Sequence, residues 1–182
     1  MILYINACVR NESRTDRIAR TLLEKLGDYT ELKLSEENLK PLDKDTLDYR
    51  SELISKKQFD DDMFKYARQF VNADIIVISA PFWDKSFPAV LKTYIENIYI
   101  TGLVSKYDED GKQVGLCKAS KLYYITTAGG PYVSTYSYDY IKDLATGAFG
   151  IKDTELIYAE MLDIVGNDPE KILGDAINAI KM

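Results

Sequence analysis

The chain has 182 residues, 46% of them hydrophobic and 29% charged, a composition typical of one soluble globular domain. The 23 basic and 29 acidic residues give a net charge of −6, which disfavours a surface that binds nucleic-acid phosphates. Histidine is absent and Cys8 and Cys117 are the only cysteines, so histidine-based triads, the usual zinc sites and a disulfide framework are excluded. Without a signal-peptide pattern or an apolar stretch of about 20 residues, we expect a cytoplasmic protein with no membrane insertion.

Hydrophobic spacing alternates along the chain between short apolar runs, typical of buried strands, and repeats at helical spacing. Strands are predicted at residues 1–5, 30–34, 74–80, 121–127 and 155–160, and helices at 18–26, 59–71, 90–98, 140–149 and 168–180. Strands that alternate with helices predict an α/β fold, in which a parallel sheet is covered on both faces. The alternating pattern at 30–34 indicates an edge strand.

Two segments fall outside this alternation. Residues 35–58 are polar, and we expect an irregular loop there, of a kind that is usually functional or mobile. Residues 102–118 form an excursion around the turn sequence Asp108-Glu109-Asp110-Gly111, which predicts a hairpin. No linker or repeat divides the chain, so we expect one domain over residues 1–182.

The loop after the first strand carries hydroxyl and basic side chains and leads into the first helix. In an open α/β sheet, ligands bind where the strands end, and a helix N-terminus offers free N–H groups to an anion. Ser13 and Thr15 add hydroxyl groups, while Arg10 and Arg14 add positive charge. The pattern indicates a phosphate site. The alternative is that Ser13 only caps the helix, with Asp16 completing a capping box.

The loop after the third strand contains two aromatic residues, Phe82 and Trp83, between Pro81 and Pro88. A stiff aromatic platform of this kind could cover one face of a planar ring. The alternative is that both aromatics belong to the core or to an interface. Their position at the end of a strand, where a polar loop is expected, favours a ligand.

The loop after the fourth strand is Thr127-Ala128-Gly129-Gly130-Pro131-Tyr132. Paired glycines let the backbone approach a flat ligand and present N–H groups to it, although the same residues could form a simple turn. The three loops together predict a ligand with an anionic tail, a flat ring and polar ring edges. Flavin mononucleotide (FMN) has this shape, and neither a Walker loop nor a GxGxxG motif is present for another nucleotide.

At these loops the sequence resembles the FMN-dependent NADH:quinone oxidoreductase family, whose members are also called azoreductases. The family motifs are Ser-Pro-Arg followed by Ser-x-Ser, then Ala-Pro-Met-Tyr-Asn-Phe, then Ser-Arg-Gly-Gly, and finally Phe-Gly before an Ile with a later Ala-Glu pair. The similar segments here, in the same order, are Cys8-Val9-Arg10, Ser13-Arg14-Thr15, Ala80-Pro81-Phe82-Trp83-Asp84-Lys85, Thr127-Ala128-Gly129-Gly130, Phe149-Gly150-Ile151 and Ala159-Glu160.

The resemblance implies a flavodoxin-like three-layer sandwich, with a five-stranded parallel sheet of order 2-1-3-4-5. It also implies tightly bound FMN, NADH or NADPH as co-substrate, a homodimer, and ping-pong transfer of reducing equivalents to a small flat quinone, azo or nitroaromatic acceptor. No catalytic side chain and no metal are expected, because FMN carries the chemistry. The residues expected to bind FMN are Cys8, Arg10, Ser13, Thr15, Pro81, Phe82, Trp83, Asp84, Lys85, Thr127, Ala128, Gly129, Gly130 and Tyr132.

Three positions depart from the family pattern. Cys8 replaces a Ser, which weakens one expected phosphate contact, and Ala128 replaces an Arg, which removes a positive charge near the ring edge. Asp84 replaces an Asn, and a carboxylate near reduced flavin would lower its reduction potential unless it is hydrogen-bonded or points away.

Two other functions are compatible with this fold. A flavodoxin-type electron carrier shares the fold and the cofactor, but its Thr-x-Thr-Gly-x-Thr phosphate loop does not match residues 6–15 and it has no counterpart of the 102–118 excursion. The departures at Cys8, Asp84 and Ala128 leave open a catalytically silent flavin-binding regulator.

Overall fold

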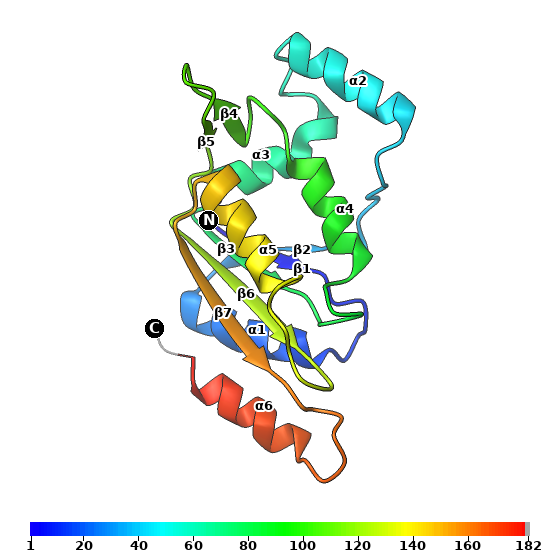
Figure 1. Ribbon diagram of the computed structural model, residues 1–182, viewed down its shortest axis with the longest axis vertical. Helices are drawn as coiled ribbons and strands as arrows, with labels where there is room; N and C mark the ends of the chain where they lie inside the picture. Colours follow the sequence, from blue (N-terminus) through cyan, green and yellow to red (C-terminus); the bar gives the residue numbers. More distant parts are fainter. Residues whose placement is uncertain (181–182) are drawn as a thin grey trace.

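A five-stranded parallel sheet forms the centre of the computed structural model, which describes residues 1–180 (Figure 1). Its strands are β1 (Ile2–Asn6), β2 (Tyr29–Lys33), β3 (Ile75–Ser79), β6 (Lys121–Thr127) and β7 (Asp153–Ala159). They lie in the order β2-β1-β3-β6-β7, and every neighbouring pair is parallel. Since β6 and β7 are the fourth and fifth strands of this sheet along the chain, the predicted order 2-1-3-4-5 is confirmed, with the weakly patterned second strand at an edge.

Helices cover both faces of the sheet and form the two outer layers (Figure 1). On one face lie α1 (Arg14–Leu26) and α6 (Pro169–Asn178). On the other lie α3 (Lys65–Asn72), α4 (Ala89–Ile98) and α5 (Tyr138–Asp143), and α5 continues as the π-helical turn η2 (Leu144–Phe149). Alternate residues of each strand supply the two cores, as in β6, where Tyr124 packs with one layer and Tyr123 with the other.

The segment 35–58 contains a helix, so the expectation of an irregular loop was wrong. The helix α2 (Lys44–Ser55) begins after Asp43, whose carboxylate accepts a hydrogen bond from the Thr46 N–H (2.8 Å). Only Leu53 of this helix is buried. The helix therefore lacks the apolar stripe on which periodicity depends, and its end cap and exposed i,i+4 ion pairs such as Lys44–Asp48 support it instead.

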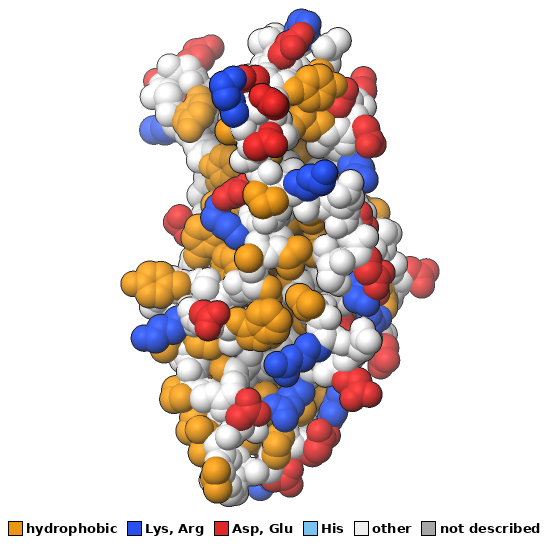
Figure 2. Space-filling view, turned by 90° about the vertical axis from the view of Figure 1, so that its right-hand side faces the viewer, with side chains coloured by type: hydrophobic (Ala, Val, Ile, Leu, Met, Phe, Trp, Pro, Cys, Tyr) orange, Lys and Arg blue, Asp and Glu red, His pale blue; other side chains and the backbone are white. Residues whose placement is uncertain are grey.

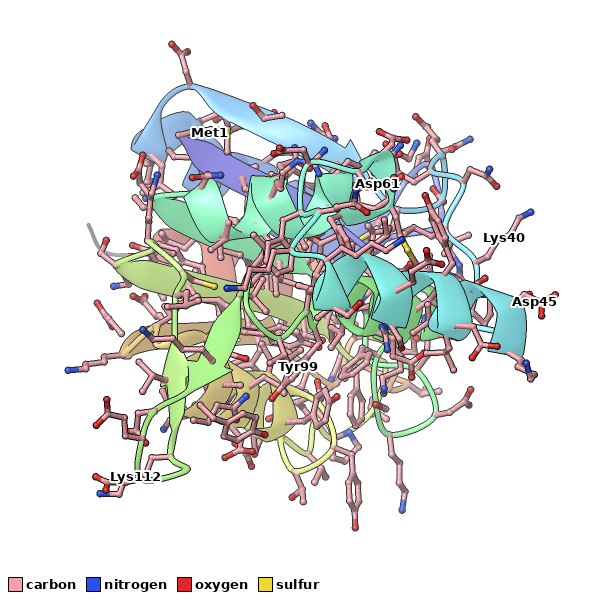
Figure 3. The ribbon with its side chains drawn as sticks, turned by 90° about the horizontal axis from the view of Figure 1, so that it is seen from above. Met1, Lys40, Asp45, Asp61, Tyr99 and Lys112 are labelled. Carbon is pink, nitrogen blue, oxygen red and sulfur yellow. The ribbon has the colours of Figure 1, made fainter. Side chains whose placement is uncertain are left out.

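The predicted hairpin is present and projects from the body of the molecule, with Lys112 near its tip (Figure 3). It consists of β4 (Ser105–Tyr107) and β5 (Gln113–Gly115) in antiparallel pairing. At its base, Gly115 lies against the backbone of Phe149 and Gly150, where a Cβ atom would overlap with main-chain atoms.

Three predicted helices have boundaries or geometry that differ from the prediction. The helix expected at 59–71 begins as the 3₁₀ turn η1 (Asp62–Phe64), with Asp61 as its N-cap. The helix expected over 140–149 changes to π geometry at Leu144, and the last helix ends at Asn178 although Ile180 is also buried. Among the described residues, no helix has the length and apolar character needed to cross a membrane.

Candidate functional site

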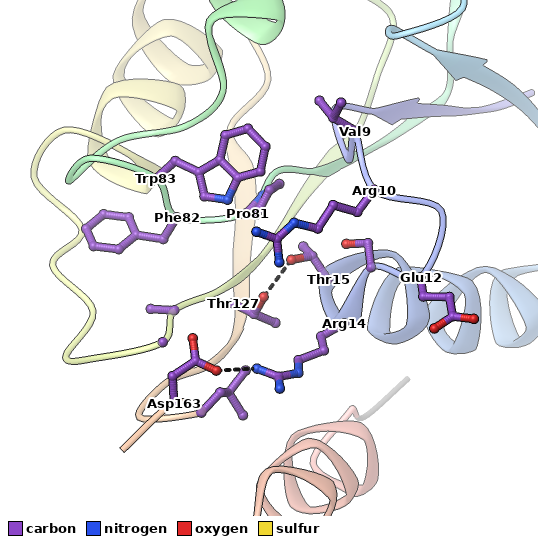
Figure 4. A pocket seen from close by; sticks show the side chains of 14 residues that line it. Val9, Arg10, Glu12, Arg14, Thr15, Pro81, Phe82, Trp83, Thr127 and Asp163 are labelled. Carbon is purple, nitrogen blue, oxygen red and sulfur yellow. Dashed lines mark hydrogen bonds and ion pairs between the residues drawn. The ribbon is translucent and has the colours of Figure 1, made fainter. Parts of the chain in front are cut away.

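A cavity of about 560 Å³ opens at the carboxyl edge of the sheet, where the loops after β1, β3, β6 and β7 meet (Figure 4). Backbone hydrogen bonds tie these loops together beyond the strand ends: Ala7 N–H donates to Ser79 O, Phe82 N–H to Thr127 O, and Ala128 N–H to Ala159 O (2.9, 3.0 and 2.9 Å). The convergence expected from the parallel topology is therefore present. Figure 2 shows this face, on which hydrophobic side chains are exposed between Lys and Arg side chains.

Most of the residues predicted to bind a cofactor line this cavity: Arg10, Ser13, Thr15, Pro81, Phe82, Trp83, Thr127, Ala128 and Gly129. Five predicted residues do not belong to the lining: Cys8, Asp84, Lys85, Gly130 and Tyr132. Five further residues complete it: Val9, Glu12, Arg14, Leu162 and Asp163. The sequence pattern indicated Arg14 as a source of positive charge in the first loop but did not place it among the residues expected to bind FMN. Leu162 and Asp163 follow β7, and the sequence pattern did not predict a ligand-binding loop there.

Ser13 both caps α1 and lines the cavity. Its Oγ accepts a hydrogen bond from the Asp16 N–H (3.3 Å). Asp16 does not complete a capping box, since its carboxylate accepts hydrogen bonds from Tyr4 (2.5 Å), Asn6 (3.0 Å) and Arg20 (2.8 Å) instead. The helix N-terminus leaves the N–H groups of residues 14 and 15 without a hydrogen-bond partner within the described chain, so the donors required for anion binding remain free.

Cys8 lies beneath the first loop, with 2% of its surface exposed, rather than in the cavity. Its N–H donates to Asn6 Oδ1 (2.9 Å), and its Sγ lies 3.5 Å from Ser79 Oγ. Burial raises the pKa of the Cys8 thiol, and burial likewise raises the pKa of the neighbouring Tyr4 hydroxyl. Both groups therefore stay protonated at neutral pH, and the Cys8 thiol packs beneath the loop against Ser79.

The second loop forms a two-residue turn that presents Trp83 at the cavity. Trp83 N–H donates to Ser86 O (3.0 Å) and Ser86 N–H donates to Trp83 O (2.8 Å). Asp84 and Lys85 between them have φ values of 50° and 65°, so both lie in the left-handed region and their side chains are exposed. Trp83 is 37% exposed, which excludes the alternative that it is a core residue of this chain.

The third loop brings its backbone close to the loop after β7. Asp163 N–H donates to Gly129 O (2.8 Å) and Met161 N–H donates to Gly130 O (3.0 Å). A Cβ atom on Gly129 would overlap with the Asp163 carboxylate, so the glycine leaves room for that carboxylate where it lies. The Glu160 carboxylate accepts the Tyr132 N–H (2.6 Å), which anchors the far end of the loop.

The loops also place polar and aromatic groups around the cavity floor. Thr15 Oγ1 and Thr127 Oγ1 form a buried hydrogen bond (2.7 Å) that joins α1 to β6 (Figure 4). The Phe82 ring makes an edge contact with Tyr132 at a centroid distance of 5.0 Å. Tyr132 therefore supports the platform from outside the lining, and burial raises the pKa of its hydroxyl.

Charges of both signs surround the opening. Arg10 points into the cavity in Figure 4, and Arg14 pairs with Asp163 (2.8 Å), while Glu12 is exposed. An anionic tail, a flat ring and a polar ring edge would each find a complementary surface: free helical N–H groups, the Phe82–Trp83 platform and the glycine backbone. The cavity thus fits the shape of FMN.

Comparison with known proteins agrees with this geometry. A family model described as a flavodoxin-like fold matches residues 1–182. The chain is 38% identical over 196 residues to FMN-dependent NADH:quinone oxidoreductase 2 of Clostridium acetobutylicum, covering 99% of this chain and 96% of that protein. It is 35% identical over 190 residues to the FMN-dependent NADH:quinone oxidoreductase of Coprothermobacter proteolyticus, covering 97% and 94%.

Solved structures show the same fold. An azoreductase from Bacillus anthracis superposes with a TM-score of 0.81 at 24% identity, covering 97% of this chain and 94% of that one. The structure of an FMN-dependent NADH-azoreductase from Bacillus anthracis in complex with FMN also gives 0.81 at 24% identity, with 97% and 93% covered. The chain has the flavodoxin-like fold and belongs to the FMN-dependent NADH:quinone oxidoreductase family.

Proposed function

We propose that this protein is an FMN-dependent oxidoreductase that transfers reducing equivalents from NADH or NADPH to quinones and to azo or nitroaromatic compounds. The observation that carries the proposal is the single cavity in which an anion site, an aromatic platform and a glycine backbone meet. The relatives named above as FMN-dependent NADH:quinone oxidoreductases support the same activity over nearly the whole chain.

Each end of the cavity has a distinct task in this proposal. Ser13, Thr15 and the free N–H groups of the first turn of α1 would hold the phosphate, with Arg10 adding charge. Phe82 and Trp83 would pack on the ring. Gly129 and Gly130 have N–H groups without a partner within the described residues, and these would bind the polar edge of the ring. The remaining residues proposed to contact or shape the FMN site are Cys8, Pro81, Asp84, Lys85, Thr127, Ala128 and Tyr132.

Bound FMN supplies the ability to accept a hydride from a nicotinamide and to reduce a second molecule. The chain's own contribution is orientation and electrostatics. Free N–H groups at Gly129 and Gly130 would stabilise negative charge at the ring edge. With Phe82 and Trp83 packed on the ring, nicotinamide and acceptor would stack in turn on the ring surface that these side chains leave open. Because both substrates use one surface, we expect ping-pong kinetics.

Steady-state kinetics tests this scheme directly. NADH and NADPH should each be assayed as donor against a small panel of quinones and one azo dye. Parallel lines in double-reciprocal plots are expected, because the first product leaves before the acceptor binds. Intersecting lines would show that donor and acceptor occupy the site together and would contradict the proposal.

Stopped-flow mixing separates the proposed enzyme from an electron carrier. The FMN-loaded protein should lose its flavin absorbance on mixing with NADH or NADPH, whereas a flavodoxin-type carrier would not be reduced directly. A catalytically silent regulator would bind FMN and fail to turn over any acceptor. A protein that takes up no FMN at all would exclude all three functions together.

Removal of the Ser13 hydroxyl tests the phosphate site. We expect Ser13→Ala to weaken FMN binding about tenfold and to leave riboflavin binding nearly unchanged, because riboflavin lacks the phosphate. Dissociation constants from quenching of flavin fluorescence provide the measurement. Ser134→Ala is the control, since Ser134 bonds Asp139 and lies outside the cavity lining. Equal losses for both flavins would leave Ser13 with only its capping role.

Truncation of Trp83 tests the ring platform. Trp83→Ala should weaken binding of both FMN and riboflavin and alter the preference among acceptors, while thermal unfolding of the apoprotein changes little because the indole is 37% exposed. Tyr107→Ala on the hairpin, which removes another exposed aromatic ring, is the matched control. A large loss of stability with unchanged flavin affinity would assign Trp83 to packing instead.

We also propose that the protein is a cytoplasmic homodimer. Exposed apolar side chains beside the site support an interface there, among them Val133 (50%) and Tyr136 (66%). The free thiols Cys8 and Cys117 fit a reducing compartment. Sedimentation velocity at micromolar concentration should give the dimer mass, and Tyr136→Glu should shift the equilibrium to monomer. A monomer at all concentrations would contradict the assembly.

A further inference from the structure

One ion pair in the lining of the cavity joins two distant parts of the chain. Arg14, the first residue of α1, donates from Nη1 to Oδ1 of Asp163 over 2.8 Å, and the two residues are 149 positions apart in the sequence. Figure 4 shows the two side chains pointing toward each other at the lower end of the cavity. Both residues line it together with Gly129.

Asp163 is fixed against the glycine segment that follows β6. Its N–H donates to Gly129 O (2.8 Å), and the absence of a side chain on Gly129 is what leaves room for its carboxylate. The carboxylate therefore lies next to Gly129, whose backbone N–H the proposed function assigns, together with that of Gly130, to the polar edge of the flavin ring. An acidic group at this place would disfavour reduction of a bound flavin, because reduction adds negative charge to that edge of the ring.

The glycine segment itself offers no positive side chain, since Ala128 precedes Gly129 and Gly130. Arg14 supplies the missing charge from a different element. Without it, the Asp163 carboxylate would oppose reduction of a flavin in the cavity, because like charges disfavour each other at short range. The pair is exposed, with 42% and 69% of the two side chains accessible, so its effect is modest and sensitive to salt.

We propose that Arg14 is a charge-balancing positioning residue that neutralises Asp163 beside the flavin ring and thereby raises the reduction potential of the bound FMN. The inference deepens the proposed function and rests on it, because it requires FMN in this cavity. It assigns Asp163 a role in tuning the potential and Arg14 a role distinct from holding the phosphate.

Potentiometry of the FMN-loaded protein tests the inference. Arg14→Gln should shift the midpoint potential to a more negative value, equivalent to about a two- to fivefold change in the equilibrium constant for reduction. Asp163→Asn should shift it in the opposite direction. The double variant, which removes both charges, should return close to the wild-type value, and Arg14→Lys should keep the wild-type potential because the charge is retained.

Arg17→Gln is the matched control. Arg17 lies on the same helix and pairs with Glu170 (2.6 Å), but it does not line the cavity. This variant loses the same charge and a similar ion pair, so its potential should remain at the wild-type value. Thermal unfolding of each apoprotein shows whether folding is retained, as expected for side chains that are exposed.

Three results would overturn the inference. The first is an Arg14→Gln potential equal to that of Arg17→Gln, and the second is a double variant far from the wild-type value. The third is an Arg14→Gln variant with unchanged potential that loses affinity for FMN but not for riboflavin, since Arg14 would then serve the phosphate. Potentials are obtained with dithionite, so a protein that binds FMN but is not reduced by NADH or NADPH fails the proposed function without affecting this test.

Discussion

Asp84 and Lys85 place local backbone strain next to the candidate site. Both residues have positive φ values in the turn that presents Trp83, and two hydrogen bonds between Trp83 and Ser86 close this turn. Aspartate tolerates the left-handed region because its short side chain can bond locally, whereas lysine has no such compensation. The strain at Lys85 is therefore maintained by the turn and by the Ser86 Oγ, which donates to Tyr136 O (2.6 Å).

Replacement of Lys85 by glycine should relieve this strain. We expect Lys85→Gly to raise the free energy of unfolding by about 0.5 kcal/mol, because the relief of left-handed strain exceeds the entropy that glycine adds to the unfolded chain. Urea denaturation provides the measurement. Lys152→Gly is the control: Lys152 is exposed with an ordinary φ, so its loss should lower stability by about 0.5 kcal/mol. A loss at both positions would show that the turn is unstrained.

The buried thiol of Cys117 gives a prediction about reactivity and its dependence on pH. Burial raises the pKa of the Cys117 thiol from 9.0 to about 12. Because the thiolate is the nucleophile, labelling of Cys117 by iodoacetamide at pH 8 should be about a thousandfold slower in the folded protein than in urea. The raised pKa also means that the thiol stabilises the fold below pH 9 and that this contribution is lost as the pH rises toward 12. Mass spectrometry of the peptide measures labelling, and equal rates in both states would contradict the pKa.

At the scale of elements, the hairpin makes one close approach to a helix end. Gly115 at the end of β5 packs against the backbone of Phe149 and Gly150, where the π-helical turn η2 stops. Gly150 has a φ of 81°, so it ends the helix in the left-handed conformation that glycine adopts without strain. The base of the hairpin thus meets the helix end main chain against main chain, while the tip projects from the body of the molecule (Figure 3).

A methyl group at this contact should separate the two elements. We expect Gly115→Ala to lower the free energy of unfolding by about 2 kcal/mol, because the added Cβ would overlap with rigid backbone. Gly147→Ala within η2 is the matched control, since nothing lies within 4 Å of its added Cβ and its stability should stay the same or rise slightly. Chemical denaturation of both variants gives the comparison. Similar effects at the two positions would show that the hairpin is not docked there.

At the scale of the whole molecule, we expect stability to be concentrated in the middle of the sheet. The strands β1, β3 and β6 each pair with a strand on both sides and are covered by both cores. By contrast, β2 lies at an edge with its first residues exposed, and the hairpin forms a separate two-stranded sheet. The loops of the site follow the three central strands and β7. We therefore expect the strands that position these loops to form a rigid frame.

Amide hydrogen exchange should reproduce this gradient. The N–H groups of β1, β3 and β6 are expected to exchange only through global unfolding, whereas those of β4, β5 and α2 exchange faster by orders of magnitude through local opening. Time-resolved exchange with peptide mapping by mass spectrometry measures the difference. Equal protection of the sheet and the hairpin would contradict the view that the central strands are more stable than β4, β5 and α2.

The sequence by itself determined the alternation of strands and helices, their order along the chain and the three loops that meet at the carboxyl edge. These features could be predicted because each depends on neighbours in the sequence: strand and helix periodicity, glycine pairs and a cap before a helix. The strand order followed from the family resemblance. Where an element lacks a periodic apolar face, as in α2, the same method failed, since only Leu53 is buried there.

Tertiary structure alone decided which side chains of those loops face the cavity. Cys8 lies beneath its loop and Lys85 is exposed on a turn, although both belong to segments that the sequence singled out. The contribution of Asp163 and its pairing with Arg14 was also invisible, because a contact between residues 149 positions apart leaves no periodic signal. Local patterns specify how a segment folds, but the direction of a side chain and its partner depend on the packing of elements that are remote in the sequence.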